Sequence, residues 1–408
     1  MARPGPRACG RGRGLLFALG LAALASAQHP WSPNKDQDVD LAADEERVYE
    51  TFFDSVVIPA RDAVKEKLAE PITVGASNAS EIANLECAAD ALTTRIVKAD
   101  RKIVIVGGGP AGLSAAVYAA RADMAPLIVA RDGGQLEGTS SVHNYPGFED
   151  GVDAVELIQR LEKQAARFGA DYKHCGIERV DLSCRPFKIY CEDGEVFTTS
   201  ALVVATGASP RWLGAPGERE LLSRGVHTCA TCDGYFYRDR DVVVVGGGDT
   251  AMEQALFLAR IANRVYVVHR KNSFRASKAM ATRVLKHPKI LILWDTVISR
   301  FLAGDDGNLN AVELVTDPQG GTASETSLSV DGAFVAIGMN PNTELFTEVR
   351  KDEDGYIYTL PGSTVTSVTG VYAAGDVQDA VYRQAITSAG TGAMAAMDAE
   401  RWLCEHGC

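Results

Sequence analysis

Two cysteines at a close spacing, Cys229 and Cys232, are the residues of this sequence best suited to chemistry. Two thiols separated by two residues can close a small disulfide ring, and such a ring accepts and returns two electrons. The next residue, Asp233, is placed to move a proton as thiol and thiolate interconvert. The pattern predicts a redox-active disulfide with a neighbouring acid.

Other interpretations of these residues stay open at this point. Half of a zinc site has the same spacing, but a structural zinc ion needs four ligands and the sequence contains no second Cys-x-x-Cys pair, so we expect no metal. A purely structural disulfide would stabilise the chain weakly, because so short a loop constrains little of the unfolded chain. Asp233 could also serve only to cap a turn.

A glycine-rich turn follows the first strong strand signal. The apolar run Arg101–Val106 leads into Gly107-Gly108-Gly109-Pro110-Ala111-Gly112, which is followed by a helical stretch through Arg121 and a second apolar run, Leu127–Ala130. The first glycine of such a turn permits a tight bend, the third lets a pyrophosphate approach the backbone, and the last lets helix and strand pack closely. The order predicts a dinucleotide-binding unit.

The same motif recurs later in the chain. The apolar run Val242–Val245 leads into Gly246-Gly247-Gly248-Asp249-Thr250-Ala251, then a helix to about Ala262 and a strand at Val265–Val268. Two copies in this context predict two nucleotide sites.

The residues after each copy indicate which nucleotide it binds. An NAD site usually has a carboxylate here for the ribose hydroxyls, whereas the second copy is followed by basic residues, namely His269, Arg270, Lys271 and Arg275. A basic cluster suits a 2'-phosphate and favours NADPH, with a solvated basic turn as the alternative. After the first copy no acid directly follows Ala130, so either Asp132 contacts the ribose or no residue does.

A late segment assigns a flavin to the first copy. The apolar run Val371–Ala374 ends in Gly375-Asp376, and Gly390-Thr391-Gly392 falls in the helical stretch that follows. A carboxylate at such a strand end can hold ribityl hydroxyls while the helix N-terminus faces the flavin. Ala205-Thr206-Gly207 ends another apolar strand and marks the crossing between domains.

These signals predict an α/β protein with two Rossmann-like, three-layer nucleotide-binding domains. The flavin domain is split into residues 99–211 and 337–408, and the NADPH domain with the cysteine pair, residues 212–336, is inserted between the halves. A dithiol that packs on the flavin cannot at the same time meet a protein disulfide, so we expect the inserted domain to rotate.

The first residues predict targeting. Residues 1–27 contain four arginines, the apolar run Leu15–Ala25 and a small-residue triplet, which is typical of a cleavable signal peptide. Residues 28–98 predict a helical extension that includes the glycosylation triplet Asn78-Ala79-Ser80. We expect the secretory pathway (endoplasmic reticulum lumen or secreted) or an organelle reached through it.

Composition limits the partners. The 408 residues are 46% apolar and 23% charged, as in a soluble globular chain of two or three domains. The formal charge of -12 repels polyanions, so we expect no nucleic-acid partner and, after signal cleavage, no membrane.

Residues 99–403 resemble the low-molecular-weight NADPH-thioredoxin reductase family. The resemblance is carried by both glycine motifs, the Cys229–Asp233 segment, the basic cluster, and by Gly133-Gly134-Gln135-Leu136, Asn144-Tyr145-Pro146-Gly147 and Gly375-Asp376 with Arg383-Gln384-Ala385. It implies a homodimer in which NADPH reduces FAD, FAD reduces the disulfide, and the dithiol reduces thioredoxin or a related protein.

The resemblance also implies individual roles. Cys232 would lie nearest the flavin, Cys229 would attack the partner, and Asp233 would be the acid/base. FAD would be contacted by Gln135, Asn144, Asp376, Arg383 and Gln384, and the 2'-phosphate by Arg270, Lys271 and Arg275. In this sequence Lys271 stands where the family usually has arginine.

The C-terminal tail and the function leave alternatives. The tail Trp402–Cys408 is expected just beyond the family's last helix, where Cys404 and Cys408 could form a second, shuttle dithiol or be ordinary thiols. An FAD-dependent dithiol oxidase that uses oxygen is one competing function, although its relatives lose the basic cluster. A non-catalytic, nucleotide-responsive binding protein is another, which the intact cysteine pair disfavours.

Overall fold

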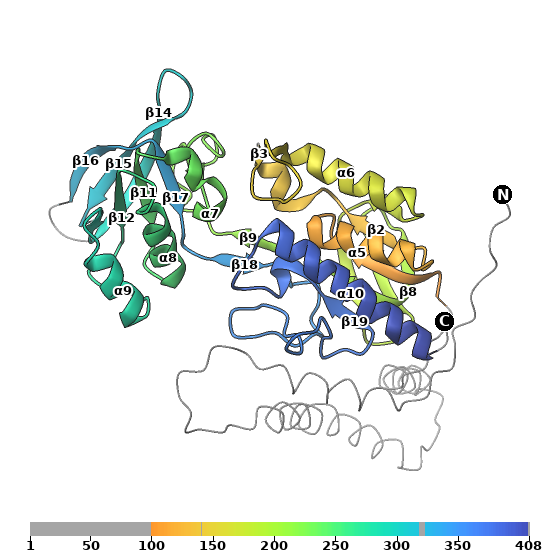
Figure 1. The fold of residues 1–408 in the computed structure, drawn as a ribbon. Helices are drawn as coiled ribbons and strands as arrows, with labels where there is room; N and C mark the ends of the chain where they lie inside the picture. Colours follow the sequence, from red (N-terminus) through yellow and green to blue (C-terminus); the bar gives the residue numbers. More distant parts are fainter. Residues whose placement is uncertain (1–98, 140, 318–322, 407–408) are drawn as a thin grey trace, which may run out of the picture. The chain divides into compact units, whose positions relative to one another are not determined.

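The computed structural model describes residues 99–139, 141–317 and 323–406 (Figure 1). The predicted signal peptide, the predicted extension with Asn78, and Cys408 therefore lie outside the described residues. Residues Lys98–Leu182 and Pro186–Arg401 form one compact unit, which contains both glycine motifs and the cysteine pair. Within the described ranges, no helix has the length and apolar character needed to cross a membrane.

The first sheet is built around the first glycine motif. Its strands follow the order β5-β2-β1-β8-β7-β6, and β19 also pairs with β8. Strand β8 is long enough to have two neighbours on one side, because its first half pairs with β7 in antiparallel and its last residues pair with β19 in parallel. The strands are β1 (Arg101–Val106), β2 (Leu127–Ala130), β5 (Asp171–His174), β6 (Ile177–Asp181), β7 (Phe187–Cys191), β8 (Val196–Val204) and β19 (Val371–Ala373).

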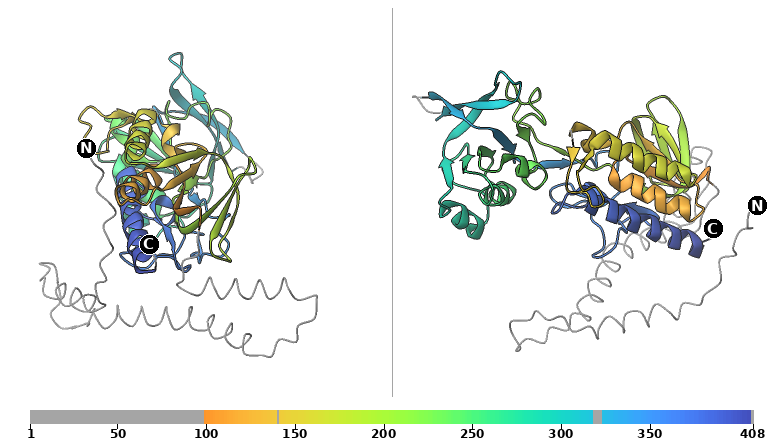
Figure 2. Two further views of the ribbon diagram at one scale, coloured as in Figure 1. Left: turned by 90° about the vertical axis from the view of Figure 1, so that its right-hand side faces the viewer. Right: turned by 45° about the horizontal axis from the view of Figure 1, so that its top comes forward.

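Burial explains the strand signals. All four residues of β2 and the last four of β1 are buried, as expected for parallel strands covered on both faces. Helices α5 (Pro110–Arg121), α6 (Ala154–Arg167) and α10 (Ala385–His406) lie side by side (Figure 2). The Asp153 carboxylate caps α6 by accepting a bond from the Glu156 backbone N–H at 2.9 Å.

A second parallel sheet carries the second glycine motif. Its order is β10-β17-β11-β12-β13, and a three-stranded antiparallel sheet, β14-β15-β16, belongs to the same part of the chain. Its helices are α7 (Ala230–Asp233), α8 (Asp249–Leu258) and α9 (Lys278–Leu285). Its strands are β10 (Val226–His227), β11 (Asp241–Val245), β12 (Arg264–Val268), β13 (Ile290–Leu293), β14 (Thr296–Ala303), β15 (Leu309–Thr316), β16 (Ser324–Ser329) and β17 (Gly332–Val335).

The two sheets are joined by two chain crossings that run side by side. Strand β9 (Ala208–Pro210) leaves the first sheet, β18 (Met339–Pro341) returns to it, and the two strands pair in antiparallel. The remaining short elements are β3 (Ser141–Val142), β4 (Val152–Asp153) and the 3-10 turns η2 (Gly134–Gly138), η3 (Gly234–Tyr237) and η4 (Gly375–Val377). The predicted fold class is confirmed, whereas the domain boundaries at 211/212 and 336/337 stay a prediction.

The structure corrects the expectation for the C-terminal tail. Helix α10 does not end before Trp402 but continues to His406. The residues from Trp402 to His406 contain no proline or glycine, and glycine occurs only at position 407, so nothing in this segment stops the helix. Cys404 is therefore a helical residue.

A second disulfide, which the sequence analysis did not predict, joins Cys175 to Cys191 with a Cα–Cα distance of 5.9 Å. Cys175 follows β5, and Cys191 ends β7. The hairpin register pairs Ile177 with Cys191, so the disulfide closes the open end of the β6–β7 hairpin. Residues Phe187, Ile189 and Cys191 alternate inward along β7, and this alternation was the available signal that Cys191 faces the core.

Candidate active site

The cysteine pair forms a disulfide on a single helical turn. Cys229 is the N-cap of α7, its sulfur accepts the Cys232 backbone N–H at 3.2 Å, and the Cα atoms of the pair are 5.3 Å apart. Residues three apart on a helical turn share one face, so this short helix holds both sulfurs together.

One side chain from the other end of the chain lies beside both sulfurs. Gln384 Oε1 is 3.9 Å from the Cys232 sulfur, and Gln384 Nε2 is 4.0 Å from the Cys229 sulfur. Gln384 Nε2 also donates to Thr231 at 3.4 Å, and Asn144 donates to Gln384 Oε1 at 3.2 Å. The disulfide is thereby placed against two residues predicted to contact FAD.

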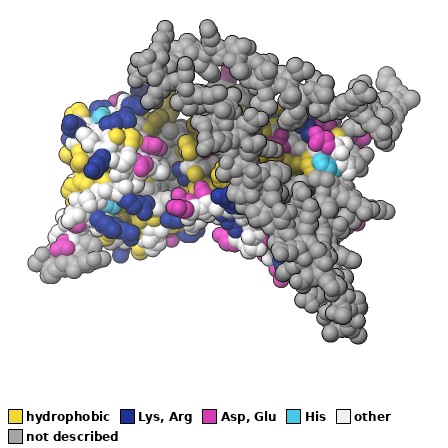
Figure 3. All heavy atoms as spheres, turned by 90° about the horizontal axis from the view of Figure 1, so that it is seen from below, with side chains coloured by type: hydrophobic (Ala, Val, Ile, Leu, Met, Phe, Trp, Pro, Cys, Tyr) yellow, Lys and Arg dark blue, Asp and Glu magenta, His cyan; other side chains and the backbone are white. Residues whose placement is uncertain are grey.

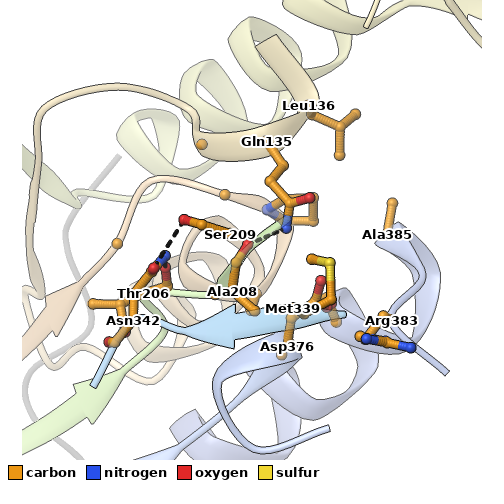
Figure 4. A pocket seen from close by; sticks show the side chains of 18 of the residues that line it. Gln135, Leu136, Thr206, Ala208, Ser209, Met339, Asn342, Asp376, Arg383 and Ala385 are labelled. Carbon is orange, nitrogen blue, oxygen red and sulfur yellow. Dashed lines mark hydrogen bonds between the residues drawn. The ribbon is translucent and has the colours of Figure 1, made fainter. Parts of the chain in front are cut away.

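These groups line a cavity of about 1460 Å³. Figure 4 shows part of its wall, with Gln135, Asp376 and Arg383 among the labelled residues. Cys229, Cys232 and Asp233 line the cavity together with most residues of the predicted flavin set. Those residues are Gly107, Gly109, Pro110, Ala111, Gly134, Gln135, Leu136, Asn144, Thr206, Gly207, Gly375, Asp376, Arg383, Gln384 and Ala385. Gly112 lies in α5 behind the cavity wall, where a Cβ would come within 1.9 Å of the Gly107 carbonyl oxygen.

The start of α5 fits a dinucleotide pyrophosphate. Gly107 has φ +120°, and a Cβ there would lie 2.2 Å from the Ala205 carbonyl oxygen, so only glycine permits this turn. A Cβ on Gly109, the N-cap, would meet only the Gly133 carbonyl oxygen at 3.6 Å, and no side chain caps the helix. The helix N–H groups are thus left facing the cavity for a phosphate.

Asp376 fits the ribityl end of a flavin. It lies in η4 directly after β19, and its Oδ1 accepts a hydrogen bond from Ser388 Oγ at 2.8 Å. Burial raises the pKa of Asp376 above its usual value. A buried carboxyl group with one oxygen engaged retains a second oxygen to bind a ligand hydroxyl.

Several wall residues were missed by the sequence analysis. Asn342 Nδ2 donates to the Thr206 carbonyl at 2.9 Å, Thr206 Oγ1 donates to the Asn342 carbonyl at 2.6 Å, and Ser209 Oγ donates to Asn342 Oδ1 at 2.9 Å (Figure 4). Gln135 Nε2 donates to the Ala208 carbonyl. Asn342 directly follows the return strand β18, so the pairing of β18 with β9 is what brings it to Thr206.

Asp132 lines the cavity but is engaged locally. Its Oδ1 accepts the Gly134 backbone N–H at 2.9 Å, which caps the turn into η2. This contact favours the structural interpretation of Asp132 over a dedicated ribose contact.

The predicted NADPH residues, apart from Thr250, do not line this cavity and gather at the start of α8 instead. Gly246 has φ +150° and Gly248 is the N-cap of α8, again without a side-chain cap. Arg275 Nη2 would lie 3.5 Å from a Cβ on Gly248, and the Arg275 backbone N–H donates to the Gly247 carbonyl at 2.8 Å. A guanidinium beside an open helix N-terminus fits a phosphate group.

The rest of this set surrounds the same turn. His269 packs over Gly247, and burial, reinforced by the charges of Arg270, Lys271 and Arg275, lowers the pKa of His269. Asp249 Oδ1 accepts bonds from Ser277, while Ala251 is buried. Figure 3 shows Lys and Arg side chains gathered on this inserted part of the molecule.

Contacts with Cys229 and His227 hold Asp233 in place. Its backbone N–H donates to the Cys229 carbonyl at 3.1 Å, and its Oδ2 lies 3.1 Å from His227 Nδ1. The carboxylate is therefore oriented by the residue that ends β10.

Comparisons with known proteins agree with this geometry. The family described as pyridine nucleotide-disulphide oxidoreductase matches residues 101–393. The chain is 44% identical to thioredoxin reductase of Rickettsia conorii over 310 residues, covering 75% of this chain and 99% of the relative. It is 46% identical to thioredoxin reductase of Mycolicibacterium smegmatis over 307 residues, covering 74% and 97%.

Solved structures give the same result. The structure of thioredoxin reductase from Giardia duodenalis has a TM-score of 0.70 at 38% identity and covers 74% of this chain and 98% of that one. Lactococcus lactis thioredoxin reductase in its FR conformation has a TM-score of 0.51 at 35% identity, with 75% and 100% covered. The chain belongs to the thioredoxin reductase family of pyridine nucleotide-disulphide oxidoreductases, which bind FAD and use NADPH.

Proposed function

We propose that this protein takes electrons from NADPH and passes them through FAD and the Cys229–Cys232 disulfide to thioredoxin or a thioredoxin-like protein. The observation that carries the proposal is the position of the disulfide. Both sulfurs lie in the wall of the cavity that contains the predicted flavin residues, beside Gln384.

The residues of this chain have separate tasks in that reaction. The bound flavin supplies two-electron transfer between the nicotinamide and the disulfide. Cys232 would lie nearest the bound flavin, Cys229 would attack the disulfide of the partner protein, and Asp233 would exchange the proton that accompanies each step. The N-termini of α5 and α8 hold the two pyrophosphates.

The inserted domain moves during this cycle. A disulfide enclosed in the flavin cavity has no room for a protein substrate, so the domain has to swing out on the β9 and β18 crossings. The lower TM-score with the Lactococcus lactis structure than with the Giardia duodenalis structure, at similar identity, supports different arrangements of the same two parts.

We assign the protein to the secretory pathway or a compartment reached through it. The N-terminal sequence supports this assignment, and so does the buried Cys175–Cys191 disulfide, because disulfides of this kind persist in oxidising compartments.

We also assign a homodimer. Ile386, Met394 and Met397 are 42%, 38% and 44% exposed, and their spacing places them on one side of α10. A Cβ on Gly390, between them, would meet no atom within 4 Å. An apolar helical stripe of this kind is suited to packing against a second copy.

The decisive experiment is anaerobic. NADPH added to the purified protein should bleach the flavin absorbance, and oxidised thioredoxin should restore it. Cys229→Ser and Cys232→Ser should each keep the bleaching and abolish the recovery. If NADPH leaves the flavin oxidised while small dithiols and air turn over, the protein is a dithiol oxidase instead.

A further inference from the structure

Behind the disulfide, one histidine uses both of its ring nitrogens. His227 Nδ1 lies 3.1 Å from Asp233 Oδ2, and His227 Nε2 lies 2.7 Å from the Tyr237 hydroxyl. The three side chains form a continuous line of contacts that starts at Asp233, the residue after Cys232, and ends at Tyr237.

This line is shielded from water. The side chains of His227 and Asp233 are 9% and 16% exposed. The imidazole stacks on Phe334 with a centroid distance of 5.4 Å, and Tyr237 meets Phe334 edge-on at 5.6 Å. Strand pairing fixes the stack, because His227 and Phe334 are register partners in β10 and β17, and Phe334 is fully buried. Hydrogen bonds in such surroundings are strong and directional.

The charges around the line keep the tyrosine protonated. Burial, together with the negative charges of Asp233 and Asp331, raises the pKa of Tyr237 well above its usual value, and the positive charge of Arg240 opposes this only in part. Arg240 is itself paired with Asp331 at 2.8 Å. The Tyr237 hydroxyl is therefore a hydrogen-bonding group that can donate or accept, not a charge.

The geometry allows the histidine to change its protonation state without moving. As a neutral ring it donates from Nδ1 to Asp233 and accepts at Nε2 from the Tyr237 hydroxyl. As a cation it donates from both nitrogens, and the hydroxyl turns to accept. Both contacts survive in both states, so the geometry allows the His227–Asp233 pair to hold or release one proton without breaking either contact.

We propose that His227 is a positioning residue that orients Asp233 and shares with it the proton consumed when the Cys229–Cys232 disulfide is reduced. The inference rests on the role proposed above for Asp233.

The step balances. Two electrons that come from NADPH by the family's reaction break the S–S bond, one sulfur becomes a thiol with the proton from the His227–Asp233 pair, and the other is left as a thiolate. The pair, now a neutral imidazole and a carboxylate, stays without its proton while the dithiol is reduced, and the proton that NADPH delivers with its two electrons is released to solvent. When the dithiol reduces its partner, the thiol proton returns to the pair, and two protons from solvent complete the thiols of the partner.

Matched variants separate orientation from proton sharing. His227→Asn keeps an amide N–H near the position of Nδ1 but cannot carry a proton, and His227→Phe removes both functions. Tyr237→Phe keeps the ring that packs on Phe334 and removes only the hydroxyl. The flavin-loaded protein is mixed anaerobically with one equivalent of NADPH, and thiols at Cys229 and Cys232 are counted by acid quench and mass spectrometry from about pH 5.5 to about pH 9, a span that contains the ordinary histidine range.

We expect dithiol formation to slow about tenfold in His227→Asn and about a hundredfold in His227→Phe, and the pH dependence of the wild type to lose one of its ionisations in both. Tyr237→Phe should shift that ionisation and slow the step about threefold. A second readout, the pH dependence of iodoacetamide alkylation of the dithiothreitol-reduced protein without NADPH, should show the same lost ionisation.

The outcomes distinguish a failure of the inference about His227 from a failure of the proposed function on which it rests. Bleaching of the flavin by NADPH should be unchanged in all His227 variants, and its loss in the wild type would refute the proposed function itself. If Asp233→Asn slows dithiol formation but His227→Asn matches the wild type at every pH, the inference about His227 is wrong and the function stands. Adding His227→Asn to Asp233→Asn should bring no further slowing, because residues that act as a unit are not additive.

Discussion

The two disulfides that lie wholly within the described residues, Cys229–Cys232 and Cys175–Cys191, differ in most of the properties that decide what a disulfide does. Cys229 and Cys232 are three residues apart on one helical turn, border a cavity and are followed by an acid held by a histidine. Cys175, which also lines the cavity, lies between β5 and β6, and Cys191 ends β7; the two are sixteen residues apart and 8% and 1% exposed.

The difference shows that surroundings, rather than the bond, separate a redox centre from a structural link. The short loop contributes little stability, and its sulfurs lie in the cavity wall, whereas the longer loop restricts the unfolded chain more and is closed by two buried cysteines. Each of the following changes tests one side of that contrast.

The largest expected effect is the loss of activity when the Cys229–Cys232 pair is changed. Replacing Cys232 by serine removes the electron carrier, so the rate of NADPH-dependent thioredoxin reduction should fall by about 1000-fold or more. The measurement is reduction of thioredoxin in steady state. The double variant Cys175→Ala/Cys191→Ala is the matched control and should keep its turnover, per bound flavin, within about threefold. Equal losses in both variants would abolish the contrast.

The next largest effect should be a loss of stability when the Cys175–Cys191 disulfide is removed. A loop of this length is expected to contribute about 3 kcal/mol through the unfolded chain, so Cys175→Ala/Cys191→Ala should lower the urea midpoint of flavin release by the corresponding amount. In a strong reductant the difference between the two midpoints should disappear, because Cys175–Cys191 is then open in the wild type and the other disulfides are reduced in both proteins. A variant as stable as the oxidised wild type would show that the strand link is dispensable.

The features that could be predicted from the sequence are formed by residues close together in the chain, and those that could not are formed by residues far apart. The strands β1 and β2 and the end of helix α5 at Arg121 were predicted to the residue, because a glycine-rich turn between apolar runs is a local signal. The helix begins at Pro110, within the glycine motif and not after it. Cys229 and Cys232 were recognised as a pair for the same reason, since three residues of spacing define their geometry.

The features that were missed depend on strand pairing. Cys175 meets Cys191 only because β6 folds back on β7, and Thr206 meets Asn342 only because β9 pairs with β18. His227 belongs to a two-residue strand whose place beside β17 no spacing could reveal. Long-range partners of this kind become visible only once the sheet order is known.

The two disulfides should also differ in how fast a reductant and an alkylating reagent reach their sulfurs, by a smaller factor than in the two preceding tests. Under native conditions, brief treatment with dithiothreitol and then iodoacetamide should label Cys229 and Cys232 at least about tenfold faster than Cys175 and Cys191, because a buried disulfide reacts only when its strands open. Peptide mass spectrometry gives the labelled fraction of each cysteine. Labelling of all four at one rate would mean that the strand pair is as reachable as the redox pair.

The smallest expected effect concerns an ion pair beside the Cys175–Cys191 disulfide. Arg131 Nη2 and Glu192 Oε2 form an ion pair at 2.6 Å beside Cys191, but the two side chains are 66% and 54% exposed. Water and salt weaken exposed pairs, so Arg131→Gln should change the free energy of unfolding in urea by no more than about 0.5 kcal/mol, and the change should vanish in high salt. If Arg131→Gln lowered the free energy of unfolding as much as the double cysteine variant does, the ion pair would stabilise this region as strongly as the disulfide. With the expected small loss, the covalent link between Cys175 and Cys191 is what fastens the hairpin to the edge of the flavin cavity.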